Sequence, residues 1–258
     1  MEVSGFRGIV TGAAGGLGRE MCLSLAREGA QVAAFDVNVA GLAQLAADAS
    51  ASGLTLRTYV ANVAKQDEVV AAVKRAAADL GGVNGLINNA GIYRDALLVR
   101  TLPGSAAVLK FPLAQWQAVL DVDLTGPFLM AREVAAQAIE RRIRPAVIIN
   151  ISSVSRAGFA GQSNYAAAKA GVVSDARVWA HELAPHGIRV AALAPGFIRT
   201  SILDAMDPRV LQQRIASVPQ GRLGEPSEIY QGIRFIIECD YFTASCLEID
   251  GGLTGWTE

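Results

Sequence analysis

A glycine-rich turn between an apolar strand and a helix constrains the fold of this chain more than any other feature of its sequence. Strand-like residues 9–10 precede the turn, and residues 19–28 have the pattern of a helix that ends at Gly29. Glycines let backbone N–H groups approach a diphosphate at the helix start, where aligned peptide dipoles favour an anion. The spacing Thr-Gly-x-x-x-Gly-x-Gly therefore indicates a dinucleotide site, although a turn without a ligand can have the same composition. The residues expected to bind the cofactor here are Gly12, Gly16, Leu17 and Gly18.

The next strand-like segment, residues 31–36, ends in the acid Asp36. A carboxylate at this place accepts hydrogen bonds from the adenosine ribose hydroxyls and repels a 2′-phosphate. The nearby residues Ala13, Ala14 and Val37 carry no cation that could hold such a phosphate. The sequence therefore predicts NAD(H) rather than NADP(H) as the cofactor.

Strand-like and helix-like stretches alternate along the whole chain, which is typical of right-handed βαβ crossovers. Hydrophobic residues make up 52% of the sequence and charged residues 18%, as expected for a parallel sheet buried on both faces. No linker or repeat divides the chain, so we predict that residues 1–258 form a single α/β domain of the Rossmann type, a doubly wound seven-stranded parallel sheet with helices on both faces. The strands are expected near residues 7–11, 31–36, 55–60, 83–88, 146–152, 188–194 and 246–250, and the helices near residues 16–28, 39–51, 66–79, 113–141, 163–184 and 226–238.

The composition disfavours several classes of function. A net charge of −1 gives no sign of nucleic-acid binding. Residues 1–5 lack the pattern of a signal sequence, and no apolar run nears the roughly 20 residues of a membrane-spanning helix. The three cysteines and two histidines lack the spacing of metal ligands. We therefore expect a cytoplasmic protein with no metal, no nucleic-acid partner and no membrane association.

Tyr165 and Lys169 lie four residues apart in a helix-like segment, so their side chains share one face of the helix. A nearby cation favours the ionised phenol, and we expect Lys169 to lower the pKa of Tyr165 from its ordinary value of roughly 10. The preceding strand-like run ends in Ser152 and Ser153, where a hydroxyl could hold a carbonyl oxygen while the phenol gives or takes a proton. Tyrosine and lysine also share helix faces for no chemical reason, so the functional interpretation depends on the dinucleotide turn.

Most segments with unusual polar residues or glycines come directly after predicted strands. The carboxyl ends of parallel strands meet at one edge of a sheet, and ligands bind there where the strand order reverses. We therefore expect these segments to converge on one crevice. They are Gly12 to Gly18, Asp36, Asn62, Asn88 to Gly91, Ser152-Ser153 and Pro195-Gly196.

Six short segments occur in an order and at intervals that identify a family. They are Thr11-Gly12 with Gly16-Leu17-Gly18, Asn88 to Gly91, Asn150 to Ser153, Tyr165-x-x-x-Lys169, Pro195 to Thr200 and Asp250 to Gly252. Over nearly its whole length the chain resembles the short-chain dehydrogenase/reductases. Residues 161–171, 221–226 and 248–252 are most similar to the β-ketoacyl-[acyl carrier protein] reductase branch, although many alcohol and hydroxysteroid dehydrogenases share these segments.

The resemblance implies a role for each residue of the crevice. Tyr165 would be the acid for carbonyl reduction and the base for alcohol oxidation, Lys169 would hold the nicotinamide ribose, and a serine would position the carbonyl. Hydride would pass directly to or from the nicotinamide. The further cofactor contacts implied are Asn62 and Val63 against adenine, Asn89, Ala90 and Gly91 on the adenosine side, and Pro195, Gly196, Ile198 and Thr200 around the nicotinamide and pyrophosphate.

The catalytic serine has two candidates. In relatives the catalytic serine stands 13 residues before the tyrosine, and this spacing selects Ser152. Alignment of the preceding strand with that of the relatives instead selects Ser153, with one residue lost from the loop. We choose Ser153, because a one-residue slip would turn over every side chain of the strand.

Two further departures from the family pattern affect the site. Asp123 stands where relatives have asparagine, and we expect it within water-mediated reach of Lys169, where it adds a negative charge. The alternatives are that Asp123 is protonated or caps a helix start near residues 125–126. Extra residues precede Asp123, and residues 101–111 are expected to form a hairpin or flap beside the substrate entrance, with Pro103-Gly104-Ser105 as its turn.

These observations predict an NAD(H)-dependent oxidoreductase that interconverts a ketone and a secondary alcohol. The preferred substrate is a 3-oxoacyl thioester carried on acyl carrier protein or CoA. A phosphate of either carrier could contact Arg141, Arg142 and Arg144. The alternative for these arginines is a solvated helix end. The alternatives are a catabolic secondary-alcohol, hydroxyacyl or hydroxysteroid dehydrogenase, and an NAD(H)-binding sensor without turnover. The resemblance also implies a homotetramer, built through the helices near 113–141 and 163–184 and the last strand.

Overall fold

Seven parallel strands form the central sheet of the computed structural model, which describes residues 1–102, 104, 107–200, 203 and 207–254. Their order is β3-β2-β1-β4-β7-β8-β9, so the strand order reverses between β1 and β4. This confirms the predicted sheet, and the largest difference in bounds is that β4 begins at Gly85 rather than at residue 83. The strands are β1 (Arg7–Thr11), β2 (Gln31–Asp36), β3 (Leu56–Val60), β4 (Gly85–Asn88), β7 (Ala146–Ile151), β8 (Ile188–Pro195) and β9 (Cys246–Ile249).

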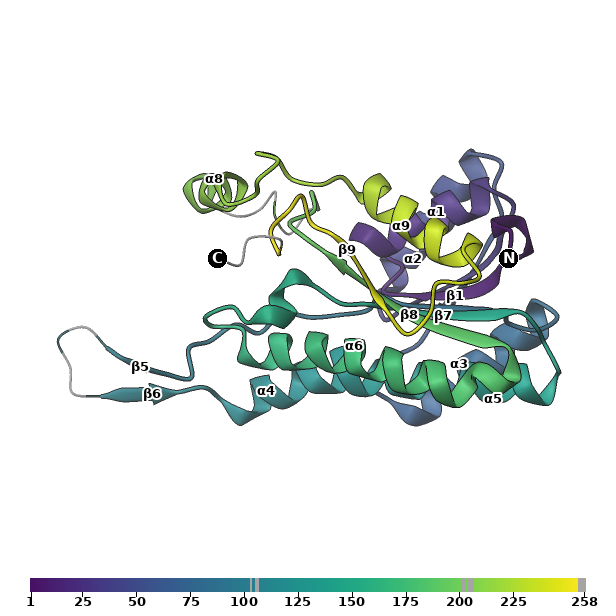
Figure 1. Ribbon diagram of the computed structural model, residues 1–258, viewed down its shortest axis with the longest axis horizontal. Helices are drawn as coiled ribbons and strands as arrows, with labels where there is room; N and C mark the ends of the chain where they lie inside the picture. The colour runs from purple at the N-terminus through teal and green to yellow at the C-terminus, as the bar shows by residue number, and fades with distance from the viewer. Residues whose placement is uncertain (103, 105–106, 201–202, 204–206, 255–258) are drawn as a thin grey trace.

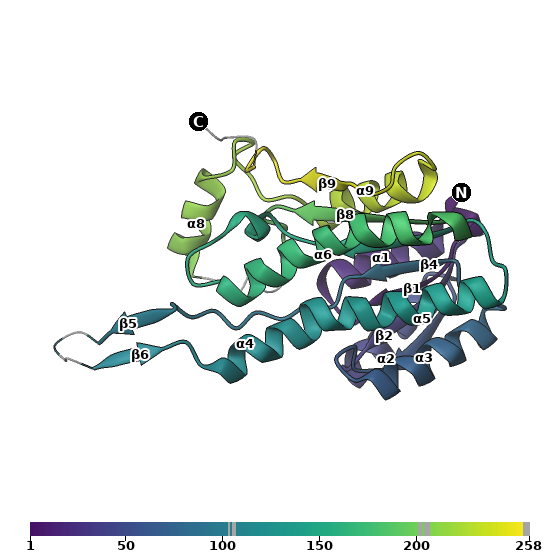
Figure 2. The same ribbon diagram turned by 60° about the horizontal axis from the view of Figure 1, so that its bottom comes forward.

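Helices cover both faces of this sheet, as Figures 1 and 2 show. Successive strand residues point to opposite faces, so Ile9 packs into one buried apolar cluster and Val10 into the other. The first cluster lies under α3 (Gln66–Asp79), α5 (Gly126–Glu140) and α6 (Ser163–Leu183), and the second under α1 (Gly16–Arg27), α2 (Val39–Ala51) and α9 (Pro226–Glu238). The doubly wound arrangement is therefore confirmed.

The helix predicted over residues 113–141 contains an irregularity that matters for the site. It consists of α4 (Leu113–Leu120), a π-helical turn (Asp121–Thr125) and α5, and its backbone stays helical throughout. A π turn within an α-helix inserts an extra residue, and such turns occur frequently at functional sites. Here the turn contains Asp123, whose side chain is fully buried.

Two elements project from the side of the molecule at which the carboxyl ends of the parallel strands lie (Figure 1). One is the hairpin of β5 (Val99–Thr101) and β6 (Val108–Lys110), which extends away from the sheet beyond α4 (Figure 2). A hairpin was predicted here, and Pro103, Ser105 and Ala106 of that prediction lie outside the described residues. The other is α8 (Pro208–Ala216), which was not predicted although Asp207 caps it and Pro208 begins it.

Three short 3₁₀ helices complete the described elements: Val3–Gly5, Val154–Ala157 and Ala184–His186. Within the described ranges, no helix combines the length and apolar character needed to cross a membrane. The same part of the chain holds no group of three or more His, Cys, Asp or Glu residues arranged to bind a metal ion.

Candidate active site

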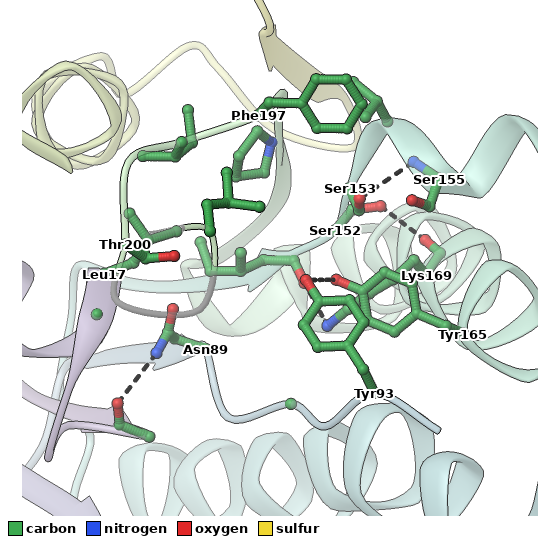
Figure 3. A pocket seen from close by; sticks show the side chains of 18 of the residues that line it. Leu17, Asn89, Tyr93, Ser152, Ser153, Ser155, Tyr165, Lys169, Phe197 and Thr200 are labelled. Carbon is green, nitrogen blue, oxygen red and sulfur yellow. Dashed lines mark hydrogen bonds between the residues drawn. The ribbon is translucent and has the colours of Figure 1, made fainter. Parts of the chain in front are cut away.

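The carboxyl ends of the strands enclose one cavity of about 550 Å³, part of which Figure 3 shows. The topological rule that places ligands at the reversal of strand order accounts for its position between the β1 and β4 ends. Most of the predicted site residues meet here. Those that line the cavity are Gly12, Gly16, Leu17, Asp36, Asn89, Ala90, Gly91, Ser152, Ser153, Tyr165, Lys169, Pro195, Gly196, Ile198 and Thr200.

Four predicted site residues are outside the lining. Gly18 lies beneath the turn, where an added Cβ would come within 2.1 Å of the Gly12 carbonyl oxygen. Asn62 accepts a hydrogen bond from the Ala64 amide within its own loop, and Val63 packs against the start of α5. Asp123 lies below the cavity, in contact with Lys169. Their roles toward a cofactor therefore stay predictions.

The glycine turn provides an open anion site at the start of α1. Gly12 and Gly16 have φ of +65° and +52°, a region that side chains with a Cβ rarely adopt. No side chain caps α1, and a Cβ added at Gly15 would meet nothing within 4 Å. The first amides of a helix have no partner within it, so they are available to an anion here. The diphosphate of a dinucleotide fits this cradle.

Asp36 stands at the end of β2 on the wall of the same cavity. Its hydrogen-bond partners among the described residues are two backbone amides, those of Ala14 and Asn38, each at 2.9 Å. A carboxylate has about four lone-pair sites, so Asp36 keeps acceptor capacity for the two hydroxyls of a ribose.

Asn89 holds the cofactor turn rather than projecting freely into the cavity. Its side-chain amide donates to the Thr11 carbonyl oxygen at 2.9 Å, and the Thr11 hydroxyl accepts from the amides of Asn89 and Ala90 at 2.9 and 3.0 Å. These bonds tie the end of β4 to the end of β1. Asn89 therefore shapes the turn on which the diphosphate site depends.

Lys169 is almost completely buried and has two polar neighbours. Its ammonium group donates to the Ile151 carbonyl oxygen at 3.1 Å and lies 3.2 Å from Asp123 Oδ2. The expectation of a water-mediated contact with Asp123 was therefore wrong: the ion pair is direct. The 3.2 Å contact is an ion pair without the alignment of a hydrogen bond.

Asp123 is held in place from a second side. Its Oδ1 accepts a hydrogen bond from the Ile92 amide at 2.9 Å. Because the chain is helical on both sides of the π turn, Asp123 does not cap a helix start, and that alternative is excluded. Burial raises the pKa of Asp123, while the positive charge of Lys169 and the Ile92 amide act in the opposite direction.

The phenol of Tyr165 does not have the lowered pKa that its spacing from Lys169 predicted. Burial raises the pKa of Tyr165 to about 12, and the negative charges of Asp123 and Asp95 add to this effect. Hydrogen bonds from Tyr93 and Ser153 act against it. Burial is the largest cause of the raised pKa, and the negative charge of Asp123, which lies beside Lys169, adds to it.

The two serines have different environments. Ser152 is buried, and its hydroxyl donates to the Lys169 carbonyl oxygen at 2.7 Å. Ser153 is half-buried, accepts a hydrogen bond from the Ser155 amide at 3.1 Å and interacts with the Tyr165 hydroxyl. The geometry thus favours Ser153 as the hydroxyl beside the phenol, and its catalytic role stays a prediction.

The sequence analysis missed several residues of the cavity wall. Tyr93 and Asp95 follow β4 directly, so the rule that selected Asn88 to Gly91 could have been extended to them. Arg214 was missed as well; its guanidinium lies 5.1 Å from the ring centroid of Phe197, a residue of the predicted segment Pro195 to Thr200. Gly15 also lines the cavity, as predicted for the segment Gly12 to Gly18, and the other lining residues without an earlier assignment are Ile151, Val154, Ser155, Gln162 and Leu203.

Two other expectations concern residues away from the cavity. Arg141, Arg142 and Arg144 precede β7 and therefore lie at the amino ends of the strands, opposite the cavity. They are exposed there and do not meet a substrate carrier at the site, so the interpretation as a solvated helix end holds. None of the described residues from 97 to 111 lines the cavity, and a flap function for the hairpin stays a prediction.

Comparisons with known proteins agree with this geometry. The family described as short chain dehydrogenase matches residues 8–210. The 3-oxoacyl-[acyl-carrier-protein] reductase of Thermotoga maritima is 38% identical over 256 residues, which cover 98% of this chain and 99% of the relative. The nodulation protein G of a Rhizobium species is 35% identical over 98% of each chain. A crystal structure described as a short-chain type dehydrogenase/reductase from Mycobacterium marinum superposes with a TM-score of 0.87 at 30% identity, covering 98% of this chain and 97% of the other.

These likenesses point to the same family as the sequence segments, the sheet topology and the cavity. The chain belongs to the short-chain dehydrogenase family of oxidoreductases.

Proposed function

We propose that this protein uses NAD(H) to interconvert a ketone and a secondary alcohol, with a 3-oxoacyl thioester as its substrate. The observation that carries the proposal is the position of the Tyr165 hydroxyl. It opens into the same cavity as the helix start of α1, next to Ser153 and Lys169. A proton donor and a dinucleotide site thereby share one enclosed space.

The side chains divide the work of carbonyl reduction. A nicotinamide dinucleotide supplies the hydride when bound. Ser153 and Tyr165 hold the carbonyl oxygen by hydrogen bonds, and Tyr165 gives its proton to that oxygen as the new C–H bond forms. Lys169 holds the ribose of the cofactor and stabilises the phenolate that remains. In alcohol oxidation the same phenolate takes the proton back.

The choice of NAD(H) rests on Asp36. Its carboxylate lines the cavity, and its hydrogen-bond partners in the described part of the chain are backbone amides. A ribose with free hydroxyls can use the remaining lone pairs, whereas a 2′-phosphate would meet a carboxylate. We expect the difference to be roughly 2 kcal/mol, or about 30-fold in kcat/KM.

The choice of a 3-oxoacyl thioester is supported by the name of the Thermotoga maritima relative and by the cavity wall. Arg214 on α8 brings a cation to that wall beside the apolar ring of Phe197. Such a pair suits an acyl chain followed by a phosphate-bearing carrier, whether acyl carrier protein or CoA. The second candidate is a secondary-alcohol dehydrogenase of catabolism, which NAD(H) use also fits.

Assembly and location follow the same family expectation. We propose a homotetramer in which α4, α5, α6 and β9 meet their counterparts, and a cytoplasmic location. Size-exclusion chromatography with light scattering tests the tetramer directly.

A substrate and cofactor panel tests the function. The purified protein is assayed with NADH and NADPH on acetoacetyl-CoA, small ketones and oxosteroids, and with NAD⁺ and NADP⁺ on the matching alcohols. We expect the highest kcat/KM for NADH with the 3-oxoacyl thioester and none above background for Tyr165→Phe. A preference for a plain ketone would select the second candidate. Cofactor binding without turnover of any substrate would instead indicate a nucleotide sensor.

A further inference from the structure

A second phenol stands directly against Tyr165. The hydroxyl oxygens of Tyr93 and Tyr165 are 3.0 Å apart, and the two ring centroids are separated by 4.5 Å at an angle of 37°. Figure 3 shows the two side chains pointing toward one another inside the cavity. Tyr93 as a whole is 44% exposed, so it is the hydroxyl end that the cavity encloses. This contact reaches the atom that exchanges a proton with the substrate.

The backbone on both sides of Tyr93 is tied to the catalytic elements. The Ile92 amide donates to Asp123 Oδ1 in the π turn at 2.9 Å. The Asn164 side-chain amide, one residue before Tyr165, donates to the Arg94 carbonyl oxygen at 3.1 Å. These anchors hold the loop on each side of Tyr93, so the position of its ring is built into the fold.

The next residues of the loop are anchored as well. Gln162, at the start of α6, donates to Asp95 Oδ2 at 2.9 Å, and the Ala96 amide donates to the Gly161 carbonyl oxygen at 2.9 Å. The loop from 92 to 96 is thus fastened along its length. A hydroxyl carried by such a loop is oriented before any substrate arrives.

The charges around Tyr165 make a hydrogen-bond donor useful at this place. Asp123 from the π turn and Asp95 from the loop after β4 both raise the pKa of Tyr165. The cations nearby are Lys169, which is paired with Asp123, and Arg214, which lies on the cavity wall against Phe197. The pKa of Tyr165 is therefore higher than its spacing from Lys169 predicts.

Tyr93 has the opposite effect on the pKa of Tyr165. Its hydrogen bond lowers the pKa of Tyr165, while burial and the contact with Tyr165 raise the pKa of Tyr93 itself. Either hydroxyl can donate while both phenols are neutral. Once Tyr165 gives up its proton, its phenolate oxygen can only accept, so Tyr93 is then the donor.

We propose that Tyr93 is a positioning residue that donates a hydrogen bond to Tyr165 and stabilises its phenolate during proton exchange with the substrate. The inference rests on the proposed role of Tyr165 as acid and base. In reduction the O–H bond of Tyr165 breaks, its electron pair stays on the phenolate oxygen, and the proton forms the alcohol O–H. The hydride from the nicotinamide cofactor forms the C–H bond. Tyr93 retains its proton throughout.

The substitution Tyr93→Phe keeps the ring and removes the donor. We expect the apparent pKa on the acid limb of kcat/KM for alcohol oxidation to rise by up to about one unit, so that oxidation below that pKa slows by up to about tenfold. Ketone reduction well below that pKa, which needs the protonated phenol, should change little. Tyr241→Phe is the control, because Tyr241 is 99% exposed.

Adding Asp123→Asn to Tyr93→Phe should bring the apparent pKa back toward the wild-type value, because the two changes act in opposite directions. An unchanged pH profile in Tyr93→Phe with an altered KM would mean that Tyr93 is only part of the cavity wall. A kcat/KM that rises equally at every pH would mean that its hydroxyl obstructs the substrate oxygen. Either result overturns the proposal. Undiminished turnover in Tyr165→Phe would instead overturn the proposed function itself.

Discussion

The two ends of the cavity are built from different materials. The cofactor end, around the start of α1, consists of backbone amides and glycines, and the side chains that matter there mainly shape the backbone. The catalytic end consists of ionisable side chains that lie close together: Asp123, Lys169 and Tyr165 are buried, and Tyr93 is partly exposed with its hydroxyl against that of Tyr165. The first end depends on shape, since an atom added at a packed position such as Gly18 would collide with the backbone of the turn. The second depends on charge, since each ionisable group changes the proton affinity of its neighbours.

This contrast predicts which substitutions harm each end. An added methyl group should be costly at the packed glycines of the cofactor end, such as Gly18, even though no charge changes. At the catalytic end the removal of a single oxygen or charge should change the chemistry while the fold stays intact. The predictions below test this difference, from the largest expected effect to the smallest.

The largest effect is expected for Tyr165→Phe. Turnover should fall by about three orders of magnitude, because the proton donor is lost. The dissociation constant for NADH, measured by fluorescence titration, should stay within a factor of about two, since the cofactor end is untouched. Tyr59→Phe is a suitable control, because the Tyr59 hydroxyl contacts Asp79 outside the cavity. A loss of NADH affinity equal to the loss of turnover would contradict the separation of the two ends.

Substitution of Ser153 should mainly affect kcat, whereas substitution of Ser152 should mainly affect the stability of the fold. Ser153→Ala should lower kcat roughly 100-fold, because a hydrogen-bond donor to the reacting oxygen is removed. Ser152→Ala should lower the free energy of unfolding by about 1 kcal/mol, because it removes a buried hydrogen bond to the Lys169 carbonyl oxygen. Steady-state kinetics and urea denaturation of both variants measure the two quantities. If Ser152→Ala is the worse variant in kcat, the strand-register argument is wrong.

At the cofactor end, Gly18→Ala and Gly15→Ala form a matched pair. The Cβ at Gly18 would lie 2.1 Å from the Gly12 carbonyl oxygen, so the turn must shift, and we expect NADH affinity to fall about 10- to 100-fold together with a lower Tm. The Cβ at Gly15 would meet nothing within 4 Å, so the Tm of the free protein should not change. Calorimetry and NADH titration compare the variants. An equal fall of Tm in both would show that the turn is not a rigid cradle.

The smallest effect is expected for Asp123→Asn. The charge of Asp123 raises the pKa of Tyr165, so its removal should shift the acid limb of the oxidation profile to lower pH. Oxidation near neutral pH should then rise several-fold, within the tenfold that one pKa unit allows. The alkaline limb of ketone reduction should move in the same direction. An apparent pKa that does not fall would mean that Asp123 is protonated at the assay pH, as its own raised pKa permits.

The cofactor half was predictable because its rules are local. Gly12, Gly16 and the start of α1 follow from a glycine run between a strand and a helix, and Asp36 follows from the end of the next strand. The sheet was predictable for a similar reason, since alternating apolar segments of strand and helix length leave few topologies. The helix α8 was not predicted, although Asp207-Pro208 is an equally local signal for the start of a helix.

Most residues of the catalytic half could be predicted from the sequence, but their pKa values could not. The sequence placed Tyr165 and Lys169 on one helix face, and this spacing alone implied a lowered phenol pKa. The direct Asp123–Lys169 contact arises from a π turn that no residue pattern announced, and burial of the whole group is a property of the assembled layers. Electrostatic effects depend on distance and on exclusion of water, neither of which is encoded in spacing along one helix.

By itself, the sequence determined the doubly wound sheet, the edge at which a ligand binds and most of the side chains that meet there, because each of these follows from short-range patterns and from the topology of parallel strands. Only the tertiary structure decided which hydroxyl faces the phenol, that Tyr93 stands against Tyr165, and that Asp123 contacts Lys169 directly. The physical reason is that these contacts join segments separated by many residues. Their distances are set when the layers pack, and their charges interact only across those distances.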